Sequence, residues 1–278
     1  MPATLFPKTA RLSLSPPRAW ARPVLLLALG LCAGFRASSA REYFEGFDAP
    51  GKPAARDGIT WSCTTELSPA DWKTLIPGDG FAYLSVHRTA WKEFSTRTRF
   101  WPFQTLSLGP IASNSRISIR ARNTAIPGVA GLLFTYREKD TVNEIDLEIV
   151  ADDTQGPFTG HKTGTDGGWT DIRLNTWINA DTERPMPTRS IRIPITDAHG
   201  RKVSHQDGKF HIYTLEWRSG GVRFFIDNVL QTAITDGAPQ PAATVIFGIR
   251  QMPWAGTPQW SGYQTMLVDW IDIEPLPE

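Results

Sequence analysis

The stretch NEIDLEIV, residues 143–150, alternates acidic with aliphatic side chains. Glu144, Asp146 and Glu148 occupy every second position, and isoleucine or leucine fills the positions between and after them. This period of two predicts a β-strand that packs one apolar face against a core. The opposite face then carries three neighbouring negative charges, which repel each other. Such a row is either a solvated surface matched by cations elsewhere or a working site.

The same alternation continues along most of the chain. It is found in RISIRARN (116–123), SIRIPI (190–195), FHIYTLEW (210–217), GVRFFID (221–227) and TMLVDWIDIEP (265–275). Glycine, asparagine, aspartate and proline separate these segments, which is typical of antiparallel strands joined by turns. No segment has sustained helical periodicity, and there is no internal repeat of fixed length. The pattern predicts an all-β fold, a sandwich of two antiparallel sheets or β-jelly-roll.

The first forty residues differ from the rest. Lys8, Arg11, Arg18 and Arg22 precede a short apolar run at 24–32, and the small residues Ala37-Ser38-Ser39-Ala40 follow it. This order predicts a secretory signal peptide over residues 1–40 and one domain over residues 41–278. The alternative is a retained membrane anchor, but the apolar run is about half of the ~20 residues that a spanning helix needs. We therefore expect a secreted or periplasmic protein with no membrane contact after signal removal.

Removing residues 1–40 takes away five basic residues and changes the formal charge from +1 to −4. A mildly acidic chain without basic runs gives no reason to expect nucleic acid as a partner. Cys63 is then the one remaining cysteine, so the fold must be stabilised by its core and not by a disulfide. The remaining length fits one all-β domain, and we expect a monomer.

Tryptophan is unusually frequent, with eleven residues, ten of them at or after Trp61. Proteins that bind sugars use aromatic planes against pyranose rings, so this surplus is compatible with a saccharide ligand. For each individual tryptophan, however, a place in the core is the preferred interpretation, because the side chain buries a large area.

The acidic row suits the cleavage of a glycosidic bond, which needs two carboxyl groups on either side of that bond. Residues four apart on a strand have Cα atoms about 13 Å apart. Two long glutamate side chains can lean together to the ~5–5.5 Å that a retaining mechanism requires. Asp146 between them crowds the site and should keep one carboxyl protonated near neutral pH. No lysine or arginine follows the row before Lys162, which argues against a solvated, neutralised surface.

The longer stretch GVAGLLFTYREKDTVNEIDLEIV (128–150) resembles the core of glycoside hydrolase family 16, which includes lichenases, laminarinases and xyloglucan transglycosylases. The family motif is Glu-x-Asp-x-Glu after a glycine-rich strand with phenylalanine and tyrosine, matched here by Gly128, Gly131, Phe134 and Tyr136. Downstream, residues 210–230, PWAGTPQW (253–260) and VDWIDIE (268–274) are similar to its hairpin, tryptophan-rich loop and last strand.

The resemblance implies a β-jelly-roll with a concave substrate cleft. It also implies that Glu144 is the nucleophile, that Glu148 is the general acid/base and that Asp146 assists the nucleophile through a hydrogen bond. The implied reaction is hydrolysis, with retention, of a β-1,3- or β-1,4-linked glucan or galactan. After Glu148 the chain has Ile149-Val150-Ala151 where the family usually has an aromatic residue and a glycine, so the resemblance does not specify which polysaccharide is bound.

The same resemblance suggests four substrate-binding residues, namely Tyr136, Asn175, Trp177 and Trp254. For Asn175 and Trp177, an edge strand without function is an equal alternative. We expect no required cofactor. Some members hold a structural calcium ion, for which Asp269 is a candidate ligand, but one oxygen of the six to eight that calcium needs favours a plain surface aspartate.

Other chemistries are poorly represented. The chain has no Gly-x-Ser-x-Gly, His-Glu-x-x-His or Cys-x-x-Cys motif, and its five histidines are scattered without ligand spacing. Two hypotheses from different classes remain: an enzyme that cleaves or transfers a β-linked polysaccharide, and a non-catalytic lectin-like jelly roll. The intact acid row favours the enzyme, because a binding module needs no matched acid pair.

Overall fold

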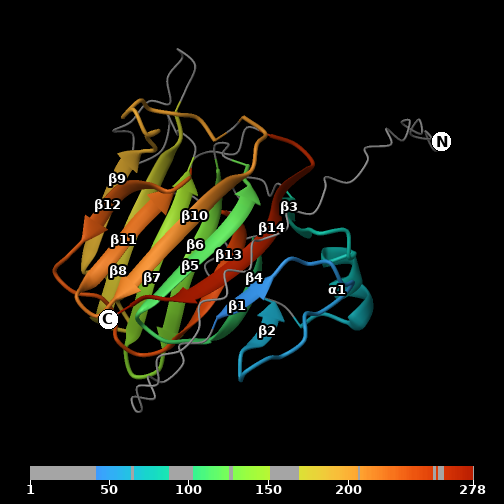
Figure 1. The fold of residues 1–278 in the computed structure, drawn as a ribbon, viewed down its shortest axis with the longest axis horizontal. Helices are drawn as coiled ribbons and strands as arrows, with labels where there is room; N and C mark the ends of the chain where they lie inside the picture. Colours follow the sequence, from blue (N-terminus) through green and yellow to red (C-terminus); the bar gives the residue numbers. More distant parts are fainter. Residues whose placement is uncertain are drawn as a thin grey trace, which may run out of the picture. The chain divides into compact units, whose positions relative to one another are not determined.

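A computed structural model describes residues 42–63, 66–87, 103–124, 128–150, 169–205, 207–252, 255 and 260–277 of the chain. All of them belong to one compact unit, residues 39–278. Within these described ranges, fourteen strands and one helix follow each other along the chain, arranged as drawn in Figure 1. They are β1 (Tyr43–Glu45), β2 (Thr60–Cys63), α1 (Pro69–Leu75), β3 (Ala82–His87), β4 (Phe103–Ile111), β5 (Ser115–Arg122), β6 (Val129–Glu138), β7 (Val142–Val150), β8 (Asp171–Ala180), β9 (Arg189–Pro194), β10 (His211–Arg218), β11 (Gly221–Ile226), β12 (Val229–Ile234), β13 (Ala243–Gln251) and β14 (Tyr263–Pro275).

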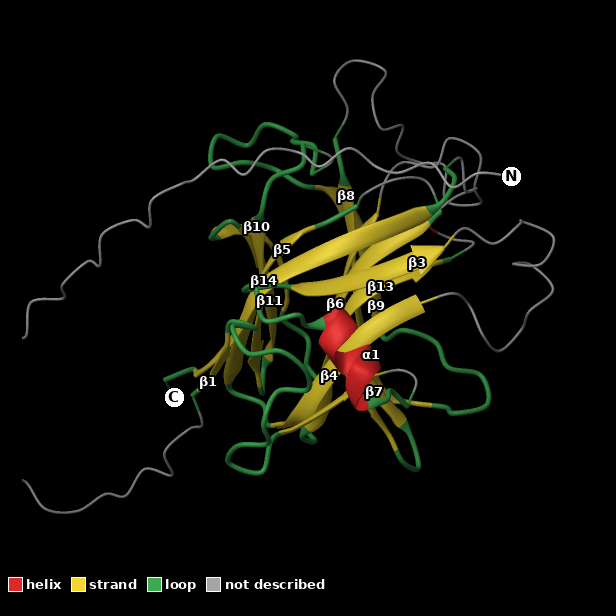
Figure 2. Ribbon diagram, turned by 90° about the vertical axis from the view of Figure 1, so that its right-hand side faces the viewer, coloured by secondary structure: helices red, strands yellow, loops and turns green. Residues whose placement is uncertain are grey.

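The strands form two antiparallel sheets of seven strands each. The first sheet has the order β1-β14-β5-β10-β11-β12, and β3 also pairs with β14. The second has the order β2-β4-β13-β6-β7-β8-β9. The sheets lie as two layers, seen from the side in Figure 2. The predicted jelly-roll sandwich is therefore confirmed, and the acidic strand β7 lies inside the second sheet between β6 and β8.

Alternation along each strand builds the core between the sheets. In β7 the side chains of Ile145, Leu147 and Ile149 are fully buried, and Ile117 and Ile119 of β5 meet them from the first sheet as members of one cluster. Burial of aliphatic side chains of this size contributes about 1.5–3 kcal/mol each. This burial fixes which face of β7 carries the acids, because a shift of one residue would expose every apolar side chain.

Several of the tryptophans lie in this core. Trp61 and Trp217 are both fully buried, and each indole N–H has a partner. Trp61 donates to the hydroxyl of Tyr43 at 2.5 Å, and Trp217 donates to the carbonyl of Pro239 at 2.7 Å. These bonds remove the penalty for burying an indole N–H. For these two residues, the preferred interpretation as core is confirmed.

One short helix, α1, interrupts the strands and was not predicted. Ser68 caps this helix by accepting from the backbone N–H of Asp71, whose carboxylate accepts from the backbone N–H of Ser68. Pro69 occupies the first turn, where its missing N–H is not needed. The sequence Ser-Pro-Ala-Asp contains the residues of this capping box, but the helix is too short to give a periodic pattern.

Among the residues that the structure describes, a search for helices with the length and hydropathy of a membrane span finds none.

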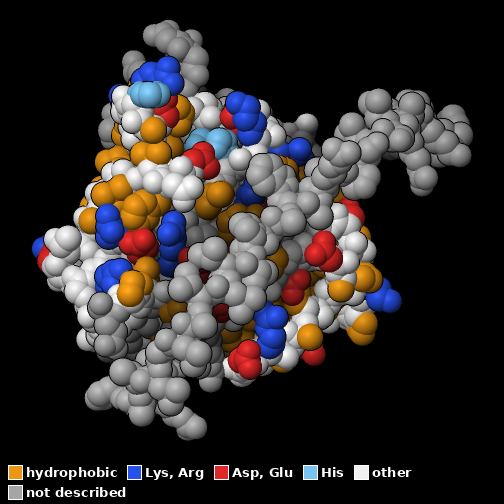
Figure 3. Space-filling view, in the orientation of Figure 1, with side chains coloured by type: hydrophobic (Ala, Val, Ile, Leu, Met, Phe, Trp, Pro, Cys, Tyr) orange, Lys and Arg blue, Asp and Glu red, His pale blue; other side chains and the backbone are white. Residues whose placement is uncertain are grey.

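Surface charge is mixed on the face drawn in Figure 3, where basic side chains alternate with acidic ones in the coloured part of the surface. Arg120 pairs with Asp269, and Arg223 pairs with Glu216 at 3.3 Å. Charges that are paired in this way neutralise each other locally.

Two histidines that are apart in sequence stack on each other beside the first sheet. The rings of His205 and His211 are parallel to within 8°, with centroids 3.7 Å apart. His205 bonds to the Tyr213 hydroxyl, and His211 bonds to Asp227 at 2.6 Å and Asp207 at 3.2 Å. Donor atoms of His205, His211 and Asp227 lie within 4.8 Å of one another. A metal ion lies in the plane of each imidazole that binds it, so two stacked parallel rings do not fit a shared ion.

Burial lowers the pKa of His205 to about 3, so this ring is neutral. For His211, burial also lowers the pKa, but the hydrogen bonds to Asp227 and Asp207 outweigh it and raise the pKa above its usual value. A raised pKa in the native state gives stability that is complete below about pH 6.5 and is lost as the pH rises through the native value.

We therefore expect His211→Gln to lower the free energy of unfolding by on the order of 1 kcal/mol at pH 6 and by less at pH 9. Urea denaturation of both proteins at the two pH values measures this. The exposed His199, changed to glutamine, is the matched control. A loss that grew between pH 6 and pH 9 would contradict the ion pair.

Candidate active site

The three acids of β7 lie together on the face of the second sheet that points away from the core. We call this the acid face, defined by Glu144, Asp146 and Glu148. Asp146 is buried, with 4% of its surface exposed, and the two glutamates are partly buried. The row is therefore not a solvated surface. The sequence alternation predicted the shared face correctly, whereas the roles of the three acids stay predictions.

The antiparallel register places specific residues beside each acid. On β6, Tyr136 lies opposite Glu144. On β8, Trp177 lies opposite Glu144 and Asn175 lies opposite Asp146. Directly opposite residues of an antiparallel pair have their side chains on the same face. Three of the four predicted substrate-binding residues are therefore brought to the acid face, and the fourth, Trp254, lies outside the described residues.

Asp146 is held by two hydrogen bonds from β8. Its Oδ2 accepts from Asn175 Nδ2 at 2.9 Å and from Trp177 Nε1 at 3.0 Å. Asn175 Nδ2 also lies 3.4 Å from Glu148 Oε2, so one amide links two of the acids. Two donors on one oxygen fix the orientation of the Asp146 carboxylate.

The side-chain oxygen of Asn175 accepts no hydrogen bond from the described residues. This atom, Oδ1, is buried. The hydrogen bond to Asp146 fixes the amide so that this oxygen is the free end. A buried acceptor without a donor is unfavourable by about 1–3 kcal/mol. A sugar hydroxyl is a donor of the right kind to occupy it.

Burial and mutual repulsion keep protons in the row. For Glu144, burial is the largest cause of a strongly raised pKa, followed by the charge of Asp146 and a hydrogen bond with it. For Glu148, burial again raises the pKa most, followed by the charge of Asp146. Three carboxyl groups so close together cannot all ionise, so the row retains a protonated acid near neutral pH.

Two arginines on other strands place positive charge near the carboxyl groups of the acid row. Arg173 Nε on β8 lies 3.5 Å from Glu148 Oε2. Its charge lowers the pKa of Glu148, as does the charge of Arg250 on β13, but burial outweighs both. The inference that no cation compensates the row was therefore incomplete, because it considered only residues near β7 in sequence. The alternation in Arg-Leu-Asn-Thr-Trp (173–177) was the available signal that Arg173 shares a face with Asn175 and Trp177.

Tyr136 lies at the edge of this arrangement. Its hydroxyl donates to a carboxylate oxygen of Glu138 and not to Glu144 opposite it. Burial and that hydrogen bond raise the pKa of the phenol, so it stays protonated. Tyr136 can therefore offer a ring edge to a ligand on the acid face, but its hydroxyl is already bonded.

The calcium ligand suggested by the sequence does not fit that role. Arg120 donates to the Asp269 carboxylate, which places a cation where calcium would need an anion. Calcium prefers six to eight oxygen ligands and no guanidinium at the site. Asp269 is thus an ion-paired residue on β14, whereas the expectation about a cofactor stays a prediction.

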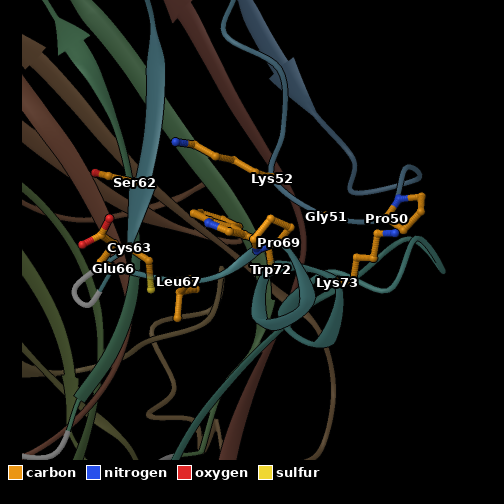
Figure 4. A pocket seen from close by; sticks show the side chains of 10 residues that line it. All are labelled: Pro50, Gly51, Lys52, Ser62, Cys63, Glu66, Leu67, Pro69, Trp72 and Lys73. Carbon is orange, nitrogen blue, oxygen red and sulfur yellow. The ribbon is translucent and has the colours of Figure 1, made fainter.

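A pocket of about 510 Å³ lies away from the acids, between β2, α1 and the segment at Pro50–Lys52 (Figure 4). Trp72 and Lys52 line it, with the Lys52 ammonium 5.6 Å from the centre of the Trp72 ring. β2 is the edge strand of the second sheet, four strands from β7. Its lining includes none of the predicted site residues that the structure describes, so this pocket is separate from the acid face.

Comparisons with known proteins agree with this architecture. No curated protein matches the sequence. A lichenase from a mouse hindgut metagenome is similar in structure, with a TM-score of 0.57, 16% identity, and coverage of 84% of this chain and 99% of that one. The apo Crh5 transglycosylase has a TM-score of 0.56, 19% identity and coverage of 86% of both chains. The laminarinase catalytic domain from Thermotoga petrophila has a TM-score of 0.53, 15% identity, and coverage of 83% and 95%.

At these identities the structural likeness establishes the fold. The sequence profile described as glycosyl hydrolases family 16 adds the family, because it matches residues 111–272, which is more than half of the chain. The matched segment runs from the end of β4 into β14 and includes the complete acid row. The chain therefore belongs to glycosyl hydrolases family 16.

Proposed function

We propose that this protein is a secreted retaining endo-β-glycosidase that hydrolyses internal β-1,3 or β-1,4 linkages of a polysaccharide, with a glucan as the first candidate. The observation that carries the proposal is the acid row itself. It combines two half-buried glutamates of raised pKa with an aspartate oriented by Asn175 and Trp177. A surface with no chemical role has no need for this costly burial of like charges.

The proposed reaction has two steps. First, a carboxylate oxygen of Glu144 bonds to the anomeric carbon while Glu148 gives its proton to the leaving glycosidic oxygen, whose bond to that carbon breaks. Then water attacks the anomeric carbon, gives a proton to Glu148 and releases Glu144 as a carboxylate. Two inversions leave the anomeric configuration unchanged.

Asp146 would assist Glu144 through the hydrogen bond between them. Glu144 must lose its proton to attack, and burial and the charge of Asp146 raise its pKa. Because Asn175 and Trp177 hold Asp146 in place, its hydrogen bond can orient the attacking carboxyl group of Glu144. Glu148, with the raised pKa, keeps its own proton for the leaving oxygen.

Transfer to a sugar acceptor uses the same covalent intermediate and differs only in whether water or a sugar hydroxyl arrives second. The likeness to the Crh5 transglycosylase keeps this activity as the second candidate. A lectin-like protein on the same fold is the third, with the acids left as vestiges.

Digestion of a panel of polysaccharides tests the proposal. We expect the wild-type protein to release oligosaccharides from lichenan or laminarin within the panel of lichenan, laminarin, xyloglucan, agarose and carrageenan. Mass spectrometry identifies the products, and early proton spectra should show the β-anomer first. An α-anomer formed first would contradict retention, larger products than substrates would indicate transfer, and binding of these glucans without cleavage would favour the lectin.

A further inference from the structure

Arg250 is a cation on the acid face that the sequence did not single out. It lies on β13, two strands from β7 in the second sheet. The neighbouring Ile249 is fully buried in the core, so alternation turns Arg250 to the other face. The charges of Glu144, Asp146 and Glu148 all act on its guanidinium, which agrees with this placement.

The guanidinium is partly desolvated and rests on an aromatic ring. Its central carbon lies 5.7 Å from the centre of the Phe103 ring, and Phe103 is the directly opposite residue on β4. Burial lowers the pKa of Arg250, although the three acids oppose that effect. The ring holds one side of the planar group, within the distance of a cation–π contact.

Arg250 lacks the partners that the other arginines of this face have. Arg173 pairs with Glu148, and Arg192 pairs with the fully buried Asp171 at 2.9 Å. Among the described residues, no carboxylate forms an ion pair with Arg250, and its buried Nε has no hydrogen-bond partner. An unmade hydrogen bond to a buried charged donor is more unfavourable than one to a neutral donor. An acceptor supplied by a ligand would remove this penalty.

The chemistry of arginine indicates which acceptor that is. A guanidinium presents its N–H groups as a planar fork that matches the two oxygens of a carboxylate or the oxygens of a sulfate. A sugar hydroxyl fits the fork less well, since it offers one oxygen and no charge. The unused Asn175 Oδ1, in contrast, suits a neutral hydroxyl.

We propose that Arg250 binds an anionic substituent, a carboxylate or a sulfate, on a sugar unit of the substrate that lies over β13. This inference rests on the proposed function and deepens it: the preferred polysaccharide carries acidic groups at intervals. Arg250 is then a specificity-determining residue that contacts substrate away from the bond that is cleaved.

Three forms of one glucan test this: lichenan, lichenan partly oxidised to carboxylate at C6, and lichenan partly sulfated. We expect the wild-type protein to prefer one charged form over neutral lichenan, and the two charged arms identify which anion is bound. Relative to its effect on neutral lichenan, Arg250→Gln should raise KM for that form about 10- to 100-fold, the range for a hydrogen bond between charged groups. Arg250→Lys keeps the charge without the fork and should restore only part of the preference.

Arg223→Gln is the matched control, because it also removes one arginine but from the first sheet, where Arg223 pairs with Glu216. Equal losses on neutral and charged lichenan in Arg250→Gln would overturn the proposal and assign Arg250 to the electrostatics of the acid row alone. Binding of the same three glucans to Glu144→Gln, with and without Arg250→Gln, gives a readout that needs no turnover. If nothing is cleaved but the charged form still binds through Arg250, the proposed hydrolysis fails and this inference stands.

Discussion

Glu144→Gln is expected to lower the rate of polysaccharide hydrolysis by at least about 10⁴-fold, because an amide cannot form the covalent glycosyl bond. The measurement is the release of reducing ends under saturating substrate. Binding of the same polysaccharide should persist, since glutamine keeps the shape and the hydrogen-bonding reach of glutamate. Glu274→Gln, an exposed position on β14, is the matched control.

The same variant should be at least as stable as the wild-type protein. Burial and the charge of Asp146 raise the pKa of Glu144, so the folded wild type must keep a proton there that the unfolded chain loses, and the neutral amide removes this cost. Thermal unfolding near pH 8 measures this, because glutamate in the unfolded chain is ionised at that pH. Substantial residual hydrolysis, or lost activity together with lost folding, would contradict the role of Glu144 as a nucleophile on a stable scaffold.

Glu148→Gln is expected to lower polysaccharide hydrolysis by about 10²–10⁴-fold, the usual contribution of a positioned general acid. With an aryl glycoside that has a good leaving group, the first step of the reaction, formation of the glycosyl-enzyme, should proceed at nearly the wild-type rate in this variant. Such a leaving group departs without receiving a proton. The rate of release of the aryl group and its burst phase measure this. Equal losses on both substrates would contradict the assignment of Glu148 as the acid.

The pH profile gives a second readout for Glu148. Burial raises its pKa, so the protonated form that donates to the leaving oxygen persists into the neutral range. Wild-type activity should fall as the pH rises through this raised value, since the proton is then lost. Glu148→Gln cannot titrate there and should lack that alkaline limb. An unchanged limb in the variant would assign the limb to another group.

The fold was predictable because its signal is local. Alternation of Ile145, Leu147 and Ile149 with the acids decides both that β7 is a strand and which face it buries. The same reasoning located β5, β9, β10, β11 and β14 to within about two residues at each end. The single helix was missed, because seven residues are too few for periodicity and its evidence was the capping box at Ser68 and Asp71.

The sequence predicted the three acids of the site, but only some of the residues that surround them. Glu144, Asp146 and Glu148 lie in one motif, so the sequence by itself determined their spacing, their common face and the family that carries them. The partners of that motif come from other strands. Asn175, which donates to Asp146, is 29 positions away from it in the sequence. Arg250, whose charge acts on the three acids, follows them by more than 100 residues.

Only the tertiary structure decided those partners, along with the stacked pair of His205 and His211. The physical reason is register: antiparallel pairing sets which residues lie opposite each other, and it depends on where every intervening loop ends. The electrostatics follow from the same cause. A carboxyl group in water has an ordinary pKa, and it is the burial imposed by the packed sheet that raises the pKa of Glu144 and Glu148.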